Sequence, residues 1–212
     1  MLVTFGNHEF ERATLSDVAV LTCRIQESQF RWIGSNIEFT SGADDRLLIE
    51  APNLVDNSLV ESGGVKVGVF SLTTAYRRPD YVAHVGAPGA TAHRMTAWLR
   101  QQGAEVVVTL THLEMEDDAA VLRNLGPDGP DLIIGGHEHH MQARKVTGPW
   151  VFKADADART ATVVQAAVTG NGPPQVSYAF RQLGPEMPED PMVMTCVQAW
   201  LERHDREYRQ TR

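Results

Sequence analysis

A strand and helix alternation over residues 65–134 constrains the fold more than any other feature of the sequence. Three runs in this stretch are rich in Val, Ile and Leu and have few polar interruptions: 65–72, 104–111 and 131–134. Nearly continuous apolar runs of this length are typical of strands that are covered on both faces, as in a parallel sheet. Helices are expected between them, over 90–102 and 117–125. Strand, helix and strand in this order predict an α/β core.

The remaining segments are expected to extend this core at both ends. Residues 2–5 form an apolar run typical of an interior strand, and apolar spacing of three and four residues predicts a helix within 11–28. Three β-rich pieces separated by Gly and Pro turns are expected to continue the sheet in antiparallel fashion: 150–153, 161–168 and 175–180. We expect one domain over 1–185 and a C-terminal helix within 186–212, a linker to a second domain that the chain does not contain.

Composition and charge exclude several classes of protein. The 212 residues carry 19 Lys and Arg against 27 Asp and Glu, which gives a net charge of −8. This balance leaves no basic surface for a nucleic acid polymer or an anionic membrane, so any phosphate chemistry needs a local cation. No apolar run reaches bilayer-spanning length and no basic leader begins the chain, so as written it is expected to be cytoplasmic. Cys23 and Cys196 lack CxxC spacing and are expected to be buried thiols.

Side chains that commonly bind metals follow three of the expected strands directly. They are Asn7 and His8 after the first strand, His112 after the run 104–111, and His137 and His139 after the last. Ligand sites in open α/β sheets lie at the carboxyl ends of the strands, so we expect these side chains to share one pocket. Imidazole together with an amide oxygen suits manganese, iron or zinc better than copper or calcium.

Each of these motifs alone has a simpler interpretation. Asn7 and His8 are also typical of a turn with capping side chains. His112 by itself is typical of a partly buried histidine with satisfied hydrogen bonds, and the histidine cluster around His137 is typical of a solvated loop. The order of the motifs, each directly after a strand, favours the metal site. The glycines beside them support it, because glycine permits tight turns and close backbone approach.

Three motifs resemble those of one enzyme family: Gly6-Asn7-His8-Glu9-Phe10, Thr111-His112-Leu113 and Gly135-Gly136-His137-Glu138-His139. They are similar to the later motifs of the calcineurin-like metallophosphoesterases, and in particular of their 5'-nucleotidase branch. The similarity continues in order and spacing through 153–159 and the helix entry at Asp190-Pro191. It implies an αββα sandwich of the metallophosphoesterase type, with two divalent metal ions between the sheets. The ions would be of the Mn, Zn, Fe or Mg kind.

The resemblance also implies roles for individual residues. The metal ligands would follow the family pattern: Asn7, His112 and His137 at one ion, and His139 at the other. His8 would face the substrate phosphate as a transition-state stabiliser or leaving-group acid. In the family an aspartate orients that histidine, whereas this chain has Glu11, whose side chain is one methylene longer. The implied substrate is a small phosphate ester, in particular a nucleotide.

Two family motifs have no counterpart in this sequence, an Asp-x-His after the first strand and a Gly-Asp after the second. Only five residues precede Gly6, so we expect the sandwich to lack its first strands and the coding sequence to continue upstream of Met1. An upstream start would allow a periplasmic or extracellular location. One metal position keeps three of four ligands and the other keeps one, so we expect weak binding of at most one ion and impaired hydrolysis. The alternative is a non-catalytic metal-binding or assembly module derived from a phosphoesterase.

Overall fold

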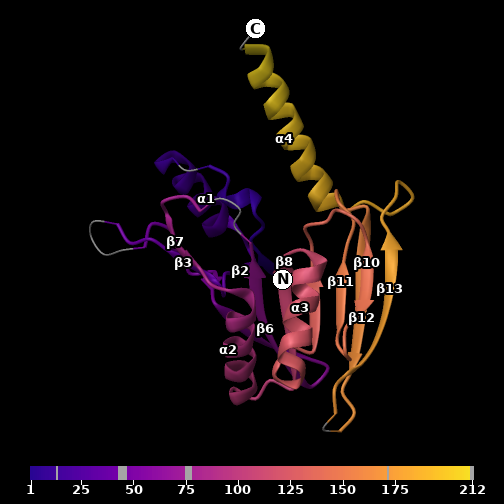
Figure 1. Cartoon of the computed structure of the whole chain (residues 1–212). Helices are drawn as coiled ribbons and strands as arrows, with labels where there is room; N and C mark the ends of the chain where they lie inside the picture. The colour runs from indigo at the N-terminus through magenta and orange to yellow at the C-terminus, as the bar shows by residue number, and fades with distance from the viewer. Residues whose placement is uncertain (13, 43–46, 75–77, 171, 211–212) are drawn as a thin grey trace. The chain divides into compact units, whose positions relative to one another are not determined.

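The computed structural model describes residues 1–12, 14–42, 47–74, 78–170 and 172–210. They form two compact units, Met1–Arg181 and Gln182–Arg212. The first unit holds the sheets and the helices α1 to α3, and the second holds the helix α4 (Pro191–Gln210). Figure 1 labels the helices α1 to α4 and several of the strands along the chain. No helix in the described residues is long and apolar enough to cross a membrane.

The larger sheet of the first unit has six strands in the order β10-β11-β9-β8-β6-β5. Their bounds are β5 (Asn57–Ser62), β6 (Val65–Thr73), β8 (Val106–His112), β9 (Leu132–Gly135), β10 (Gln142–Lys145) and β11 (Trp150–Lys153). The four central strands β6, β8, β9 and β11 run parallel, and β5 and β10 pair antiparallel at the two edges. The parallel core predicted from the apolar runs is therefore confirmed.

One prediction about this sheet is wrong, because β11 was expected to be antiparallel and runs parallel to β9. The strand β10, which the sequence analysis missed, reverses the chain first. A turn at Thr147 and Gly148, both with positive φ, then returns the chain in the direction of β9. The strand β11 consequently enters between β10 and β9.

Helices α2 (Pro88–Gln101) and α3 (Met115–Leu125) cover one face of the six-stranded sheet, as the sequence predicted. Leu99 of α2 is fully buried and packs in one cluster with Phe70 and Val107 of the sheet. Leu122 of α3 is fully buried in a second cluster that contains Ile133. A short 3-10 helix, η2 (Gly126–Asp128), follows α3. These apolar contacts fix the strand ends that carry the candidate ligands.

The smaller sheet is parallel, in the order β1-β2-β4, with bounds β1 (Leu2–Thr4), β2 (Arg31–Ile33) and β4 (Leu54–Val55). Among the described residues β1 pairs with β2 alone, so this apolar strand lies at an open edge of the sheet, as expected for a sandwich that lacks its first strands. Ser71 of β6 donates a hydrogen bond to the Ile33 carbonyl (2.7 Å), which links the two sheets. A separate antiparallel pair is formed by β3 (Ile37–Phe39) and β7 (Val82–Val85).

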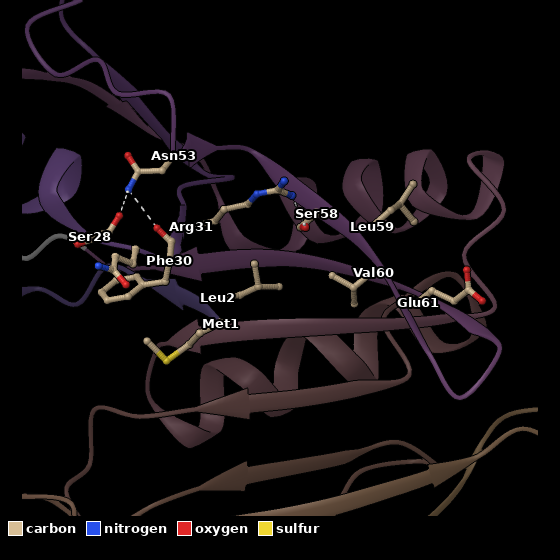
Figure 2. Close-up of a pocket in the computed structure, with 11 residues that line it drawn as sticks. Met1, Leu2, Ser28, Phe30, Arg31, Asn53, Ser58, Leu59, Val60 and Glu61 are labelled. Carbon is tan, nitrogen blue, oxygen red and sulfur yellow. Dashed lines mark hydrogen bonds between the residues drawn. The ribbon is translucent and has the colours of Figure 1, made fainter. Parts of the chain in front are cut away.

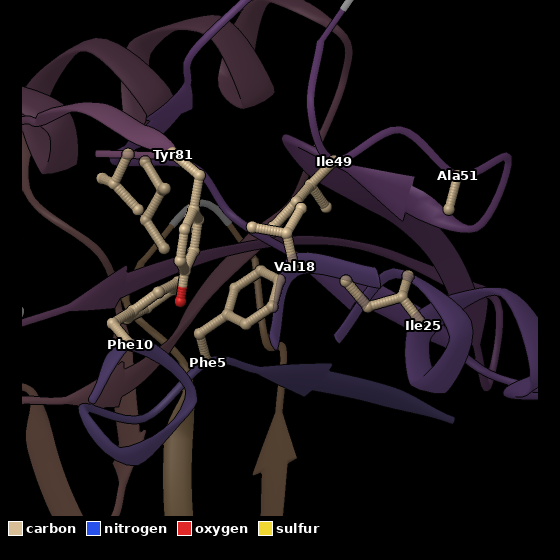
Figure 3. Close-up of a cluster of buried hydrophobic side chains, with 9 residues drawn as sticks. Phe5, Phe10, Val18, Ile25, Ile49, Ala51 and Tyr81 are labelled. Atoms are coloured by element: carbon tan, nitrogen blue, oxygen red, sulfur yellow. The ribbon is translucent and has the colours of Figure 1, made fainter. Parts of the chain in front are cut away.

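Helix α1 (Leu15–Glu27) covers the smaller sheet and confirms the helix predicted within 11–28. A capping box between Thr14 and Asp17 begins the helix. Its buried side chains pack with Phe5 and Phe10, whose ring centroids are 5.5 Å apart, in the cluster that Figure 3 shows. Helix α1, the smaller sheet, the larger sheet and helices α2 and α3 are thus four successive layers.

A hairpin of β12 (Thr160–Ala167) and β13 (Gln175–Gln182) follows the larger sheet. Tyr178 of β13 packs its ring 4.8 Å from that of Phe152 and 5.2 Å from that of Trp150, both on β11. These aromatic contacts hold the hairpin against the sheet.

Cys23 is exposed on α1, and Cys196 is exposed on α4; both are free. The prediction of buried thiols is therefore wrong. The apolar spacing of α1 assigns the buried stripe to Val18 and Ile25, and Cys23 falls on the opposite side of the helix.

A cavity of about 620 Å³ opens beside the edge strands β1 and β5 (Figure 2). Its lining includes Leu2 on one side and Leu59 and Val60 on the other. Arg31 donates a hydrogen bond to the Ser58 hydroxyl (3.2 Å) at this cavity. None of the candidate metal ligands lines it.

Candidate metal centre

The turn after β1 places Asn7 and His8 at the start of the short 3-10 helix η1 (His8–Phe10). The Gly6 amide donates to the Glu9 carboxylate (2.6 Å), which closes the turn. Phe10 is buried in the core below it. Tyr81 lies with its hydroxyl 3.0 Å from the Arg12 carbonyl and holds the turn from the other side. The turn is therefore fixed at both ends by buried groups.

Glu11 contacts His8 directly, with its Oε1 2.6 Å from the histidine Nδ1. The His8 side chain is 65% exposed and the Glu11 side chain is 55% exposed, so their contact itself adds little to stability. Its effect is orientation, because a partner at Nδ1 leaves Nε2 as the free ring nitrogen. The longer side chain of glutamate thus reaches the histidine from the position that aspartate has in the family pattern.

His112 ends strand β8 and lies between Asn7 and His137. Its Nε2 is 2.8 Å from the Asn7 Oδ1, and its ring centroid is 5.0 Å from that of His137, edge to face. A Cβ added to Gly6 would lie 3.0 Å from the His112 Cε1, so a side chain at position 6 would crowd the His112 ring. The structure brings three of the predicted ligands from three separate loops into contact.

The pKa of His112 is lowered from 6.5 to about 4. Burial of the imidazole is the main cause, and electrostatic interactions with His137, Lys153, His8 and His139 lower this pKa further. His112 is consequently neutral at pH 7, which is the form that binds a metal ion.

The loop after β9 carries His137 and His139 in strained backbone conformations. Their φ angles are 95° and 63°, in the region that favours glycine. Such residues cost on the order of 1–3 kcal/mol each and persist where the surrounding structure imposes them. His139 is exposed, and its carbonyl accepts a hydrogen bond from the Ala156 amide (3.4 Å). It influences the pKa of His112 without belonging to the contact between Asn7, His112 and His137.

A buried charged cluster that the sequence analysis missed lies beside these loops. Lys153 and Asp118 have no exposed side-chain surface, and the Lys153 Nζ is 2.8 Å from the Asp118 Oδ2 and 3.1 Å from the Glu138 Oε2. Burial raises the pKa of Asp118 to about 6, although Lys153 and a hydrogen bond from Thr111 act in the opposite direction. One sequence signal could have indicated this cluster, namely the lysine that ends the otherwise apolar run Trp150–Lys153.

Asn7, His112 and His137 carry side chains of the kinds that bind divalent cations. The His112 Nε2 donates a hydrogen bond to the Asn7 Oδ1 (2.8 Å), since an amide oxygen can only accept. The His137 ring lies beside that of His112, on the loop after β9. Within the described residues no group of three or more His, Cys, Asp or Glu side chains is arranged to hold a metal ion. The described residues bring together two imidazoles and one amide oxygen at this place.

A model of the calcineurin-like phosphoesterase family matches residues 1–141, about two thirds of the chain. The chain belongs to this family, as its motifs indicated.

Relatives and solved structures agree with this assignment. An apyrase from Aedes albopictus is 21% identical over 231 residues, which cover 95% of this chain and 40% of the apyrase. The structure of a 5'-nucleotidase precursor from Thermus thermophilus matches with a TM-score of 0.73 at 20% identity, over 95% of this chain and 43% of that one. A putative 5'-nucleotidase from Staphylococcus aureus matches with a TM-score of 0.69 at 17% identity, over 90% and 39%. The αββα metallophosphoesterase fold is confirmed, and the chain spans about 40% of the length of the apyrase.

Proposed function

We propose that this chain carries the cation-binding part of a metal-dependent phosphoesterase site whose substrates are nucleotides or similar phosphate esters. The contact of a neutral His112 with both Asn7 and His137, in a member of the phosphoesterase family, is the observation that supports it. A bound divalent cation polarises a phosphoryl oxygen and lowers the pKa of water, which is the chemistry that phosphate-ester hydrolysis needs.

The residues of the chain would prepare the site in two ways. Asn7, His112 and His137 would hold the cation, and the burial that keeps His112 neutral favours that role. His8 would present its Nε2 to the phosphate, because Glu11 occupies Nδ1. A donor at this place offsets the charge that develops on the phosphate and the leaving oxygen, worth about 2–4 kcal/mol for one well-placed group.

The proposed substrate class follows from the relatives and the charge. The similar proteins are named 5'-nucleotidases and apyrase. A net charge of −8 opposes a nucleic acid polymer and leaves a mononucleotide, which one cation and one imidazole can hold by its phosphate. His139 is proposed as the ligand of a second ion, although no group of three or more His, Cys, Asp or Glu side chains in the described residues is arranged to hold a metal there. We therefore propose that the chain binds one cation weakly and hydrolyses slowly.

Titration of Mn²⁺ into the chelator-treated chain by isothermal calorimetry tests the cation site. We expect one weakly bound ion per chain, lost in His112→Gln and in His137→Gln. His93→Gln, which removes an exposed imidazole on α2, is the matched control. Two tightly held ions, or binding that neither variant reduces, would contradict the proposal.

Binding of AMP in the presence and absence of Mn²⁺ tests the substrate part. We expect AMP to bind only with Mn²⁺, and less tightly to His8→Gln than to the wild type. Hydrolysis of bis-p-nitrophenyl phosphate should remain near background, and brisk turnover would contradict the single-ion site. A chain that binds Mn²⁺ but no phosphate ester would instead support the non-catalytic metal-binding module.

A further inference from the structure

The ammonium group of Lys153 is enclosed by four oxygen atoms although the residue lies at the end of an apolar strand. Two are carboxylate oxygens, of Asp118 at 2.8 Å and Glu138 at 3.1 Å. The other two are backbone carbonyl oxygens, of Leu113 at 2.5 Å and Gly136 at 2.9 Å. The ammonium group donates hydrogen bonds to the two carbonyls, and the two carboxylates pair with its charge. The group therefore acts as a fixed cation inside the protein.

These two carbonyls belong to residues directly next to two of the candidate metal ligands. Leu113 directly follows His112, and Gly136 directly precedes His137. One ammonium group thus holds the backbone beside both histidines, although they come from different loops. The Glu138 Oε1 also accepts a hydrogen bond from the Met115 amide. This bond joins the loop after β9 directly to the start of α3, which follows His112.

The backbone on both sides of Glu138 has conformations that neighbouring contacts must impose. His137 and His139 flank Glu138, and both have positive φ angles. Such conformations persist only where neighbouring contacts impose them, and the contacts of Glu138 and Gly136 with Lys153 are in the same segment. Gly135 is equally constrained, because a Cβ there would collide with the Thr111 hydroxyl and lie 3.1 Å from the Lys153 Nζ.

A stabilising role alone does not account for this arrangement. A buried ion pair is weak evidence for stability, because apolar residues of similar volume often replace one at no cost. An apolar residue at position 153 would leave the Leu113 and Gly136 carbonyls without their donor and release the two loops from each other.

We propose that Lys153, with Asp118 and Glu138, is a positioning cluster that sets His112 and His137 at their mutual distance before any cation binds. The part of this inference that concerns metal affinity rests on the proposed function. The part that concerns the two rings does not. Residues that orient metal ligands through hydrogen bonds typically change metal affinity by about 10- to 100-fold when they are replaced.

The test compares Lys153→Met and Glu138→Gln with the wild type in the metal-free chain. The ring centroids of His112 and His137 are 5.0 Å apart, close enough for a nuclear Overhauser effect between their ring protons. We expect this effect to weaken or disappear in both variants while circular dichroism shows a folded chain. If Lys153→Met does not fold, Glu138→Gln decides the result, because it keeps the pair of Lys153 and Asp118 and an oxygen for the Met115 amide. An unchanged effect in a folded variant would overturn the proposal.

A second readout is Co²⁺ affinity, measured by visible absorption. We expect Glu138→Gln to lower it about 10- to 100-fold. Arg144→Met, which breaks an exposed ion pair with Glu116 on the same helix as Asp118, is the control and should keep both readouts. A wild type that binds no Co²⁺ would refute the proposed metal site, and the ring contact would still decide the positioning role. A wild type that binds Co²⁺ no better than folded Glu138→Gln would refute the positioning role alone.

Discussion

Replacement of His112 by Gln should change how the stability of the metal-free chain depends on pH. The pKa of His112 is about 4 in the folded chain against 6.5 ordinarily, so below pH 6.5 the unfolded chain takes up a proton that the folded chain does not. The folded wild type therefore loses stability as the pH falls from 6.5 to 4. The full difference corresponds to about 3 kcal/mol, and the part between pH 7 and pH 4.5 to about 2 kcal/mol. The His112→Gln variant lacks this imidazole and should not lose that stability.

The assay is urea unfolding of both proteins in EDTA at pH 7 and pH 4.5. The quantity that matters is the difference between wild type and variant, because titrating groups far from His112 contribute equally to both. We expect the wild type to lose about 2 kcal/mol relative to the variant on going to pH 4.5. A difference that stays constant between the two pH values would refute the claim that burial and neighbouring charge keep His112 neutral. His93→Gln serves as the control for loss of an imidazole.

Three further substitutions test the packing that supports the site. Gly6→Ala should displace the His112 ring, since the new Cβ would lie 3.0 Å from its Cε1, and we expect Mn²⁺ affinity to fall about 10-fold with an unchanged circular dichroism spectrum. Gly135→Ala should lower the free energy of unfolding by about 1–3 kcal/mol, because the Cβ would collide with the Thr111 hydroxyl; a neutral effect in urea unfolding would show that the loop can shift. Leu122→Ala should cost about 2–5 kcal/mol by emptying space between α3 and the sheet, and a loss below about 1 kcal/mol would mean that the layer is loosely packed.

The parts of the fold that the sequence predicted are those controlled by local patterns. The apolar runs of β6, β8 and β9 and the spacing in α2 and α3 record burial directly, and the structure has them at the expected places. The direction of β11 depends on β10, a four-residue strand without a distinct pattern. The burial of Cys23 was also predicted wrongly, because the preference of free cysteine for burial is only an average. Whether a cysteine in a helix is buried depends on the face of the helix on which it lies.

The candidate site divides in the same way. Asn7, His112 and His137 could be predicted as neighbours because each lies at the carboxyl end of a strand, although β1 belongs to the smaller sheet and β8 and β9 belong to the larger one. The Lys153 cluster could not be predicted, because its partners lie 15, 17, 35 and 40 residues away and none of the contacts leaves a periodic signal. The pKa of His112 depends on the same long-range assembly of charges.

X-ray absorption of the Zn²⁺-loaded chain tests the central claim most directly, because it counts the atoms around the ion. We expect two imidazole nitrogens at about 2.0–2.1 Å with oxygen ligands and no sulfur, and one imidazole fewer in His112→Gln. A spectrum with oxygen ligands alone, with sulfur, or with the same imidazole count in the variant would contradict a cation site formed by Asn7, His112 and His137.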